Sequence, residues 1–93
     1  MGSQDHGGRA RTHTGKYEPL WRWLLARRED RLQPSFEEIE RILGFPLPPS
    51  SRRHAAHWYS YEGSAVVRAV VDAGWRACEV DLGKETVVFV REA

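Results

Sequence analysis

The sequence predicts an α+β fold in which four short helices precede a C-terminal two-stranded antiparallel hairpin. Apolar residues recur at helical spacing in four segments, which are 17–28, 36–43, 51–59 and 64–73. Two later segments are typical of strands, because 75–82 alternates between apolar and polar residues and 85–91 is rich in Thr, Val and Phe. Glycines and prolines stand between these segments, as they do at turns.

The composition indicates one small domain without a disulfide or a cofactor. The chain has 93 residues, of which 41% are hydrophobic and 29% are charged. Its one cysteine, Cys78, cannot form an internal disulfide, and metal sites built from paired cysteines are excluded. No apolar run approaches the ~20 residues of a membrane helix, and the N-terminus lacks the apolar segment of a secretory signal. We therefore expect a cytoplasmic protein that does not enter a membrane.

Residues 1–15 are expected to form a disordered basic arm, and residues 16–93 a single domain. The arm consists largely of Gly, Ser, Arg and His, so it has too little apolar surface to offset the entropy lost on ordering. The cations of the arm and of the residue that follows it are Arg9, Arg11 and Lys16. These side chains can lie along a nucleic-acid backbone or in a minor groove. An ordinary solubilising tail is the alternative.

The first helix, 17–28, is predicted to form the floor of the core. Pro19 suits its first turn, where a missing N–H costs nothing. Leu20 and Leu24 lie one turn apart on one face, and Trp23 broadens that face. Aromatic residues at this spacing are typical of packing rather than of a ligand site.

The stretch 35–60 predicts two further helices joined by a proline-rich link. Ser35 and Glu38 fit a capping box at the start of the first helix, and Gly44 suits its end. In the second helix, Trp58 faces inward while the polar residues face elsewhere. Two helices in this order resemble a helix-turn-helix, whose second helix can enter a major groove. The link GFPLPP is longer than the usual turn of that motif.

The second of these helices, 51–60, carries the candidate DNA-binding residues. Arg52 and Arg53 lie in its first turn, where arginine can bond guanine edges or phosphates. The other predicted contacts, to the DNA backbone, come from His57, Tyr59 and Ser60. A metal site at the histidines is disfavoured, because no third ligand stands nearby.

The last helix, 64–73, and the hairpin complete the predicted fold. Ser64 caps the helix, whose valines make a wide apolar surface. A surface this wide implies burial on two sides or a contact within a homodimer. A turn at Gly83 and Lys84 joins the two strands. Because a two-stranded hairpin is marginal alone, it must pack on the helices.

Two resemblances extend this interpretation. The order of helices and hairpin resembles a winged helix, with Arg52 and Arg53 on the reading helix and 83–85 at the tip of the wing. The sequence departs from that pattern, since a fourth helix intervenes and the hairpin carries net negative charge, which suits phosphate poorly. Separately, the strings KYEPLWRWL, SFEEIERILGFPLP with SSRRHAAHW, and AGWRACEVDLGKETVVFVR resemble a small, uncharacterised bacterial domain family over residues 16–91. That resemblance implies no activity.

Two functions follow as hypotheses. The first is a small protein, nucleoid-associated in that case, that binds double-stranded DNA with 51–60 as recognition helix and the basic arm on phosphates. The alternative is a protein–protein interaction or adaptor module, antitoxin-like or regulatory, that uses the valine-rich helix and the hairpin edge. No enzymatic function is expected, because the sequence shows no nucleophile with its base, no paired carboxylates, no phosphate-binding glycine loop and no metal set.

Overall fold

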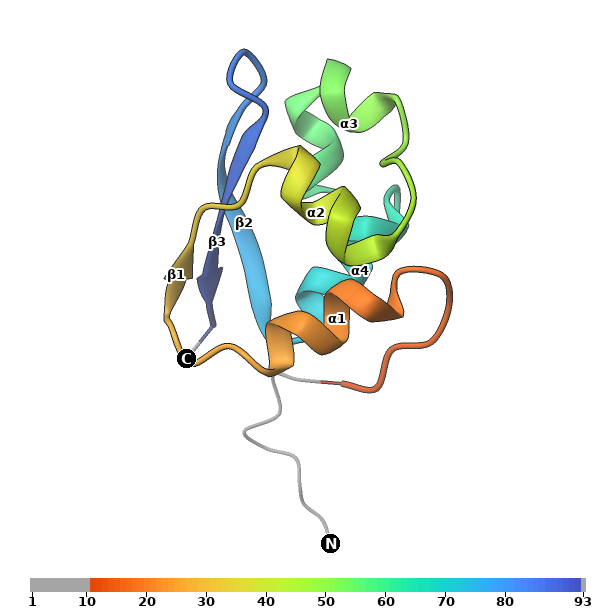
Figure 1. The fold of residues 1–93 in the computed structure, drawn as a ribbon, viewed down its shortest axis with the longest axis vertical. Coiled ribbons are helices and arrows are strands. Elements are labelled where there is room, and N and C mark those ends of the chain that lie inside the picture. Colours follow the sequence, from red (N-terminus) through yellow and green to blue (C-terminus); the bar gives the residue numbers. More distant parts are fainter. Residues whose placement is uncertain (1–10, 93) are drawn as a thin grey trace, which may run out of the picture.

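The structure is a computed structural model that describes residues 11–92 (Figure 1). Its elements, in chain order, are α1 (Glu18–Leu25), β1 (Arg31–Leu32), α2 (Phe36–Leu43), α3 (Ser50–Arg53), the 3-10 helix η2 (Ala55–Tyr59), α4 (Ala65–Asp72), β2 (Trp75–Asp81) and β3 (Thr86–Arg91). The helices precede the two long antiparallel strands in the chain, as in an α+β fold, and only the two-residue β1 lies between helices. The predicted fold class is therefore confirmed.

A third strand, β1, joins the predicted hairpin. The sheet has three antiparallel strands in the order β1-β3-β2, with Arg31 opposite Val90 and Leu32 opposite Phe89. The hairpin is present as predicted, and the sheet is one strand larger. A segment of two residues is too short to show an alternating pattern, so β1 leaves no signal in the sequence. Its addition makes β3 the central strand.

The two long strands, β2 and β3, pair with one irregularity. Their register shifts between Ala77 and Glu79, which leaves Cys78 as an extra residue in β2. This is a β-bulge, which bends a strand and increases its twist. On either side of the bulge, Phe89 and Val87 face the core from β3 and are fully buried.

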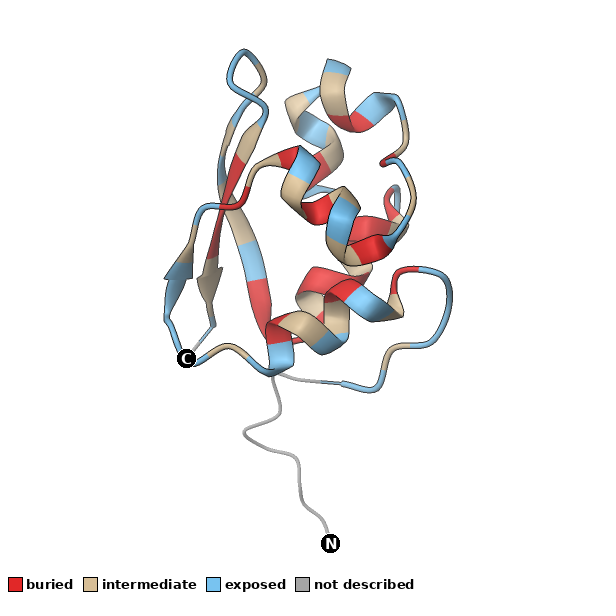
Figure 2. Cartoon of the chain, in the orientation of Figure 1, coloured by how far each residue is buried: buried red, intermediate tan, exposed pale blue. Residues whose placement is uncertain are grey.

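The core lies between the sheet and the helices. Figure 1 shows α1, α2 and α4 on one side of the sheet, and Figure 2 shows buried residues where these two layers meet. Trp58, which the sequence predicts to face inward, is 1% exposed. Its ring stacks on Phe36 at a centroid distance of 5.2 Å and lies 6.2 Å from the ring of Phe89. These three rings connect η2, α2 and the central strand.

Both predicted serine caps are present. The Ser35 hydroxyl accepts the N–H of Glu38 at 3.0 Å, and the Ser64 hydroxyl accepts the N–H of Val67 at 3.2 Å. Gly44 ends α2 in the left-handed conformation (φ 87°), which a residue without a Cβ adopts without strain. Local signals of this kind fix the start and the end of α2.

The valine-rich helix α4 is internal. It packs against α1, β2 and η2, and four of its apolar residues are buried, namely Val66, Val67, Ala69 and Val70. Of the two explanations for its wide apolar surface, burial on two sides therefore holds. This helix does not provide the open apolar surface that the adaptor hypothesis assigned to it.

Candidate functional site

The segment 51–60 is not one helix. α3 ends at Arg53, the next residue, His54, has an extended backbone (φ −134°, ψ 114°), and η2 follows. The burial of Trp58 explains the break. Its indole N–H donates to the carbonyl of Ser51 at 3.0 Å, and in a continuous helix that carbonyl would accept an N–H four residues further on. The prediction of a continuous recognition helix is therefore wrong.

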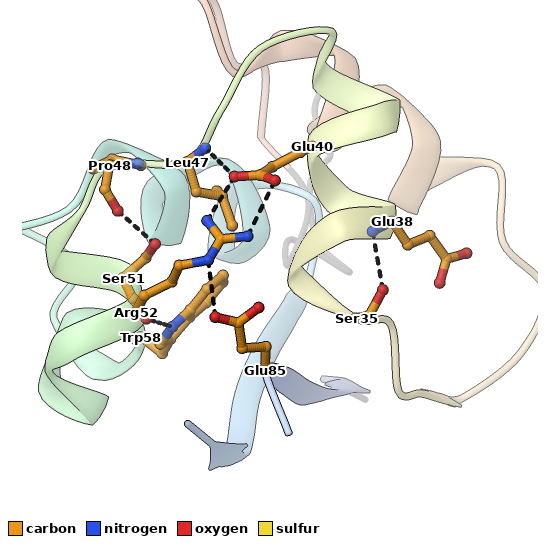
Figure 3. A network of polar contacts seen from close by, with 9 residues as sticks. All are labelled: Ser35, Glu38, Glu40, Leu47, Pro48, Ser51, Arg52, Trp58 and Glu85. Carbon is orange, nitrogen blue, oxygen red and sulfur yellow. Dashed lines mark hydrogen bonds and ion pairs between the residues drawn. The ribbon is translucent and has the colours of Figure 1, made fainter. Parts of the chain in front are cut away.

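The guanidinium of Arg52 is held by two carboxylates (Figure 3). Its Nη1 and Nη2 lie 2.7 and 3.1 Å from the two carboxylate oxygens of Glu40, and its Nε lies 3.1 Å from Glu85. The hydrogen bond from Arg52 lowers the pKa of the Glu40 carboxyl below its ordinary value, and the bond to Glu40 raises the pKa of Arg52. Bidentate pairs of this geometry are the stronger kind. Arg52, predicted to contact DNA, is instead neutralised within the domain.

Glu40 also fixes the proline-rich link between α2 and α3. Its carboxylate accepts the backbone N–H of Leu47 at 2.7 Å, and the Leu47 side chain is buried. Close by, the Ser51 hydroxyl donates to the carbonyl of Pro48 at 2.6 Å. One carboxylate on α2 therefore positions both the link and α3, and the arginine that it binds is a structural residue.

Three predicted DNA contacts are exposed beside this network. Arg53 is exposed and forms no ion pair with another described residue. Tyr59 is 52% exposed. The Ser60 hydroxyl accepts the N–H of Gly63 at 3.1 Å and is also exposed. Of the DNA-binding surface predicted on 51–60, only Arg53, Tyr59 and Ser60 are therefore exposed as expected.

His57 lies inward rather than on a DNA-facing surface. Its Nδ1 is 3.1 Å from the hydroxyl of Ser50, and its Nε2 is 3.1 Å from the hydroxyl of Ser64. The imidazole also meets the edge of the Trp58 ring at 5.5 Å. Burial lowers the pKa of His57 below its ordinary value of 6.5. The histidine therefore joins α3, η2 and the cap of α4 in its neutral form.

His57 should make stability depend on pH. Because its pKa is lower in the folded state, the unfolded chain binds more protons as the pH falls from about 6.5. We therefore expect the free energy of unfolding to decrease over that range. Urea titrations at pH 7.5 and 5.5 measure the decrease, which should shrink in His57→Gln and persist in His54→Gln, whose imidazole is exposed. Equal pH dependence in wild type and His57→Gln would contradict this assignment.

The N-terminal segment contacts the domain from Arg11 onward. The N–H of Arg11 donates to the carbonyl of Asp72 at 2.5 Å, and its own carbonyl accepts the indole N–H of Trp21 at 2.8 Å. The imidazole of His13 lies 2.8 Å from the carboxylate of Asp72, which is 7% exposed. Residues 11–15, expected in a disordered arm, are therefore part of the folded unit. Arg9 lies outside the described residues.

The predicted DNA-binding residues do not converge on one face. Lys16 lies over the rings of Tyr17 and Phe45, with its Nζ 5.6 and 5.0 Å from their centroids. Figure 1 shows the segment that holds Arg11 and Lys16 near one end of the molecule and α3 near the other. These two cations and α3 therefore lie at separate parts of the molecule.

A groove beside α1 was not expected from the sequence. It has a volume of about 780 Å³, and its apolar wall consists of Pro19, Trp23, Ala26 and Ile42. The first three recur at intervals of four and three residues, which places them in a row along α1. This second apolar stripe is the signal that the sequence offers, but helical spacing alone assigns Trp23 to a widening of the core face. Ile42 adds the opposite wall from α2.

Two further kinds of site are absent from the part of the chain that the structure describes. No helix there is long and apolar enough to cross a membrane. Residues 11–92 also contain no group of three or more His, Cys, Asp or Glu side chains placed to hold a metal ion.

Comparison with known proteins identifies a family whose function is unknown. A family model described as a domain of unknown function, DUF7662, matches residues 17–93. The resemblance to a small uncharacterised family, based on motifs over residues 16–91, is confirmed, while bacterial origin stays a prediction. No curated protein and no solved structure matches the chain. The match spans most of the sequence, and the protein therefore belongs to the DUF7662 family.

Proposed function

We propose that this domain is a protein-binding module whose groove beside α1 takes a short apolar segment of a partner that carries carboxylates. The groove itself supports the proposal. Its volume of about 780 Å³ lies within the range of pockets that bind ligands, and its wall combines an indole with aliphatic side chains. Aromatic residues in such hollows are the usual anchors of interfaces. The valine-rich helix, by contrast, is buried.

The charges around the groove favour an acidic partner. Its charged lining residues are Lys16, Glu18 and Arg22, and the one acid among them is already paired with Arg22. Arg27 lies over the ring of Trp23 at 4.9 Å and adds a cation beside the wall. Positive groups next to an apolar floor complement a segment in which Asp or Glu flanks apolar residues.

The first test of the groove is a selection of displayed peptides on the immobilised domain. Enriched peptides should hold two or three apolar residues flanked by carboxylates. Trp23→Ala should weaken their binding by about tenfold or more, because it removes the anchor surface. Leu25→Ala should not, since this residue is 41% exposed but lies outside the groove. Enrichment of basic peptides, or full binding by Trp23→Ala, would contradict the proposal.

A charge pair at one position tests the partner's chemistry separately. Ile42→Glu and Ile42→Lys both remove the same apolar contact from the groove wall. If the partner segment is acidic, the glutamate variant should bind the selected peptides more weakly than the lysine variant, because like charges repel. Equal affinities would remove the electrostatic part of the proposal.

DNA binding is the second candidate, and one observation favours it: Arg53 is exposed and forms no ion pair with another described residue. The winged-helix resemblance and a nucleoid location are predictions that belong to this candidate. Fluorescence anisotropy with a mixed-sequence duplex decides between DNA binding and protein binding in the groove. Association that falls steeply with salt and is lost in Arg53→Ala would support DNA binding over the groove.

The groove also allows a second copy of the chain as partner, which corresponds to the predicted homodimer. Sedimentation of the purified protein tests this, because a dimer that depends on Trp23 would place the second copy in the groove. A strict monomer leaves the acidic segment of another protein as the occupant. A cytoplasmic location and an antitoxin-like or regulatory role stay predictions that belong to the protein-binding function.

A further inference from the structure

A second cavity lies under the N-terminal segment. It shares Gly15 and Lys16 with the groove but none of the residues of the groove's apolar wall. It has a volume of about 420 Å³. Its lining residues come from the segment that precedes α1 and from the first turns of α4: His13, Thr14, Gly15, Lys16, Tyr17, Ala65 and Arg68. Its size is within the range of small-molecule sites.

Every lining residue of this cavity that can carry charge near neutral pH is basic. They are His13, Lys16 and Arg68, and no carboxylate lines the cavity. The nearby acid, Asp72, is already occupied, because His13 and the Tyr61 hydroxyl bind its two carboxylate oxygens at 2.8 and 3.0 Å. Lys16 and Arg68, which form no ion pair with another described residue, therefore present positive charge to a ligand in the cavity.

The segment that lines this cavity also holds neutral donors. The backbone N–H groups of residues 13–16 donate no hydrogen bond to another described residue, and Gly15 turns the chain with φ 124°. Successive free N–H groups at such a turn attract anions. Burial raises the pKa of Tyr17, so its hydroxyl keeps its proton and can donate. Thr14 adds a second hydroxyl.

Two of the basic side chains are held in place before a ligand arrives. Nη1 of Arg68 donates to the carbonyls of Tyr61 and Glu62 at 3.3 and 3.1 Å, which anchors the guanidinium beside the cavity. His13 uses Nδ1 on Asp72 and keeps Nε2 for another partner. Preorganised donors lower the entropy that binding costs.

We propose that this cavity binds the phosphate group of a small phosphate monoester. The phosphate group of a monoester presents three oxygens that accept hydrogen bonds from clustered cations and backbone N–H groups, and the free volume leaves room for the organic part of the molecule. This inference goes beyond the proposed protein-binding function, because it concerns a different ligand, and the two sites share only Gly15 and Lys16 among their lining residues.

Amide NMR spectra of the full chain, recorded with inorganic phosphate and with phenyl phosphate at constant ionic strength, test the inference. Chemical shifts should change chiefly at residues 13–17 and 65–68, more strongly with the monoester. Lys16→Gln should weaken binding by about tenfold. Lys84→Gln is the matched control, because it removes the same charge from the exposed turn between β2 and β3 and should bind normally.

Other outcomes would overturn the inference. Equal losses in both lysine variants would mean that general electrostatic attraction, rather than this cavity, holds the anion. Acetate binding as tightly as phosphate would exclude phosphate as the preferred class. Ala65→Leu, which fills the cavity from α4, should also block binding. Trp23→Ala should leave phosphate binding unchanged, so that failure of the groove and failure of this cavity are distinguishable.

Discussion

Trp58→Ala is expected to lower the free energy of unfolding by about 3–5 kcal/mol, as large-to-small changes of buried aromatic residues do. The indole is 1% exposed and stacks on Phe36. The substitution removes this contact and leaves a cavity between α2, η2 and β3. It also leaves the carbonyl of Ser51 without its indole donor. Domains of this size are stable by only about 5–15 kcal/mol, so the variant should be close to unfolding at room temperature.

Urea denaturation followed by circular dichroism measures this loss. Tyr59→Ala is the matched control, because the neighbouring aromatic residue is 52% exposed and should change stability by less than ~0.5 kcal/mol. If Trp58→Ala does not fold, Trp58→Phe keeps an aromatic ring and removes the hydrogen bond to Ser51, so it should show a smaller loss. Similar stabilities for the Trp58 and Tyr59 alanine variants would refute the packing described for η2.

Glu40→Ala is expected to lower the free energy of unfolding by about 2 kcal/mol. It leaves the N–H of Leu47 without an acceptor and removes the bidentate partner of Arg52. Both side chains of the ion pair are partly exposed, at 21% and 32%, so solvent limits the loss. The effect should exceed that of an ordinary surface ion pair, because the link to α3 loses its anchor.

Glu37→Ala is the control for this second prediction. Glu37 is also on α2, but both side chains of its contact with Arg41, at 3.8 Å, are largely exposed to solvent, so its loss should cost less than ~0.5 kcal/mol. A double-mutant cycle of Glu40→Ala with Arg52→Ala should show coupling between the two residues. Additive effects would mean that the ion pair contributes nothing beyond its separate side chains.

Features with local causes could be predicted from the sequence. The helix expected over 36–43 has those bounds in the structure, because a serine cap and a glycine end are encoded within the segment itself. The strands of the hairpin are likewise identified by alternation and by β-branched residues. The inward position of Trp58 followed from its apolar surface. Each of these predictions rests on neighbours within a few residues.

Features that depend on distant partners could not be predicted. The helical position of Arg52 correctly places it near the surface, but Glu85, one of its two partners, lies 33 residues further along the chain. The segment 11–15 is polar and alone would stay disordered, yet His13 finds Asp72 59 residues away. No periodicity in the sequence reports such pairs. The predicted DNA site required the guanidinium of Arg52 to be unpaired, whereas in the folded chain Glu40 and Glu85 bind it.

The groove was missed for a different reason. Trp23 is half-buried, so its contribution to the core and its contribution to the groove are both real. Helical spacing assigns a residue to a face but does not say where neighbouring elements stop covering that face. Ile42 comes from another helix and has no sequence relation to α1. A concave surface between two helices appears only after they pack.

The bulge at Cys78 has a consequence for aggregation. Among the described strands, β2 has a neighbour on one side only, and an open strand edge is a template on which other chains can add and grow into fibrils. The extra residue bends the strand and interrupts the even spacing of its outward N–H and C=O groups. A strand of a second molecule therefore cannot pair in regular register along the whole of this edge. We expect the bulge to reduce aggregation of the domain at high concentration.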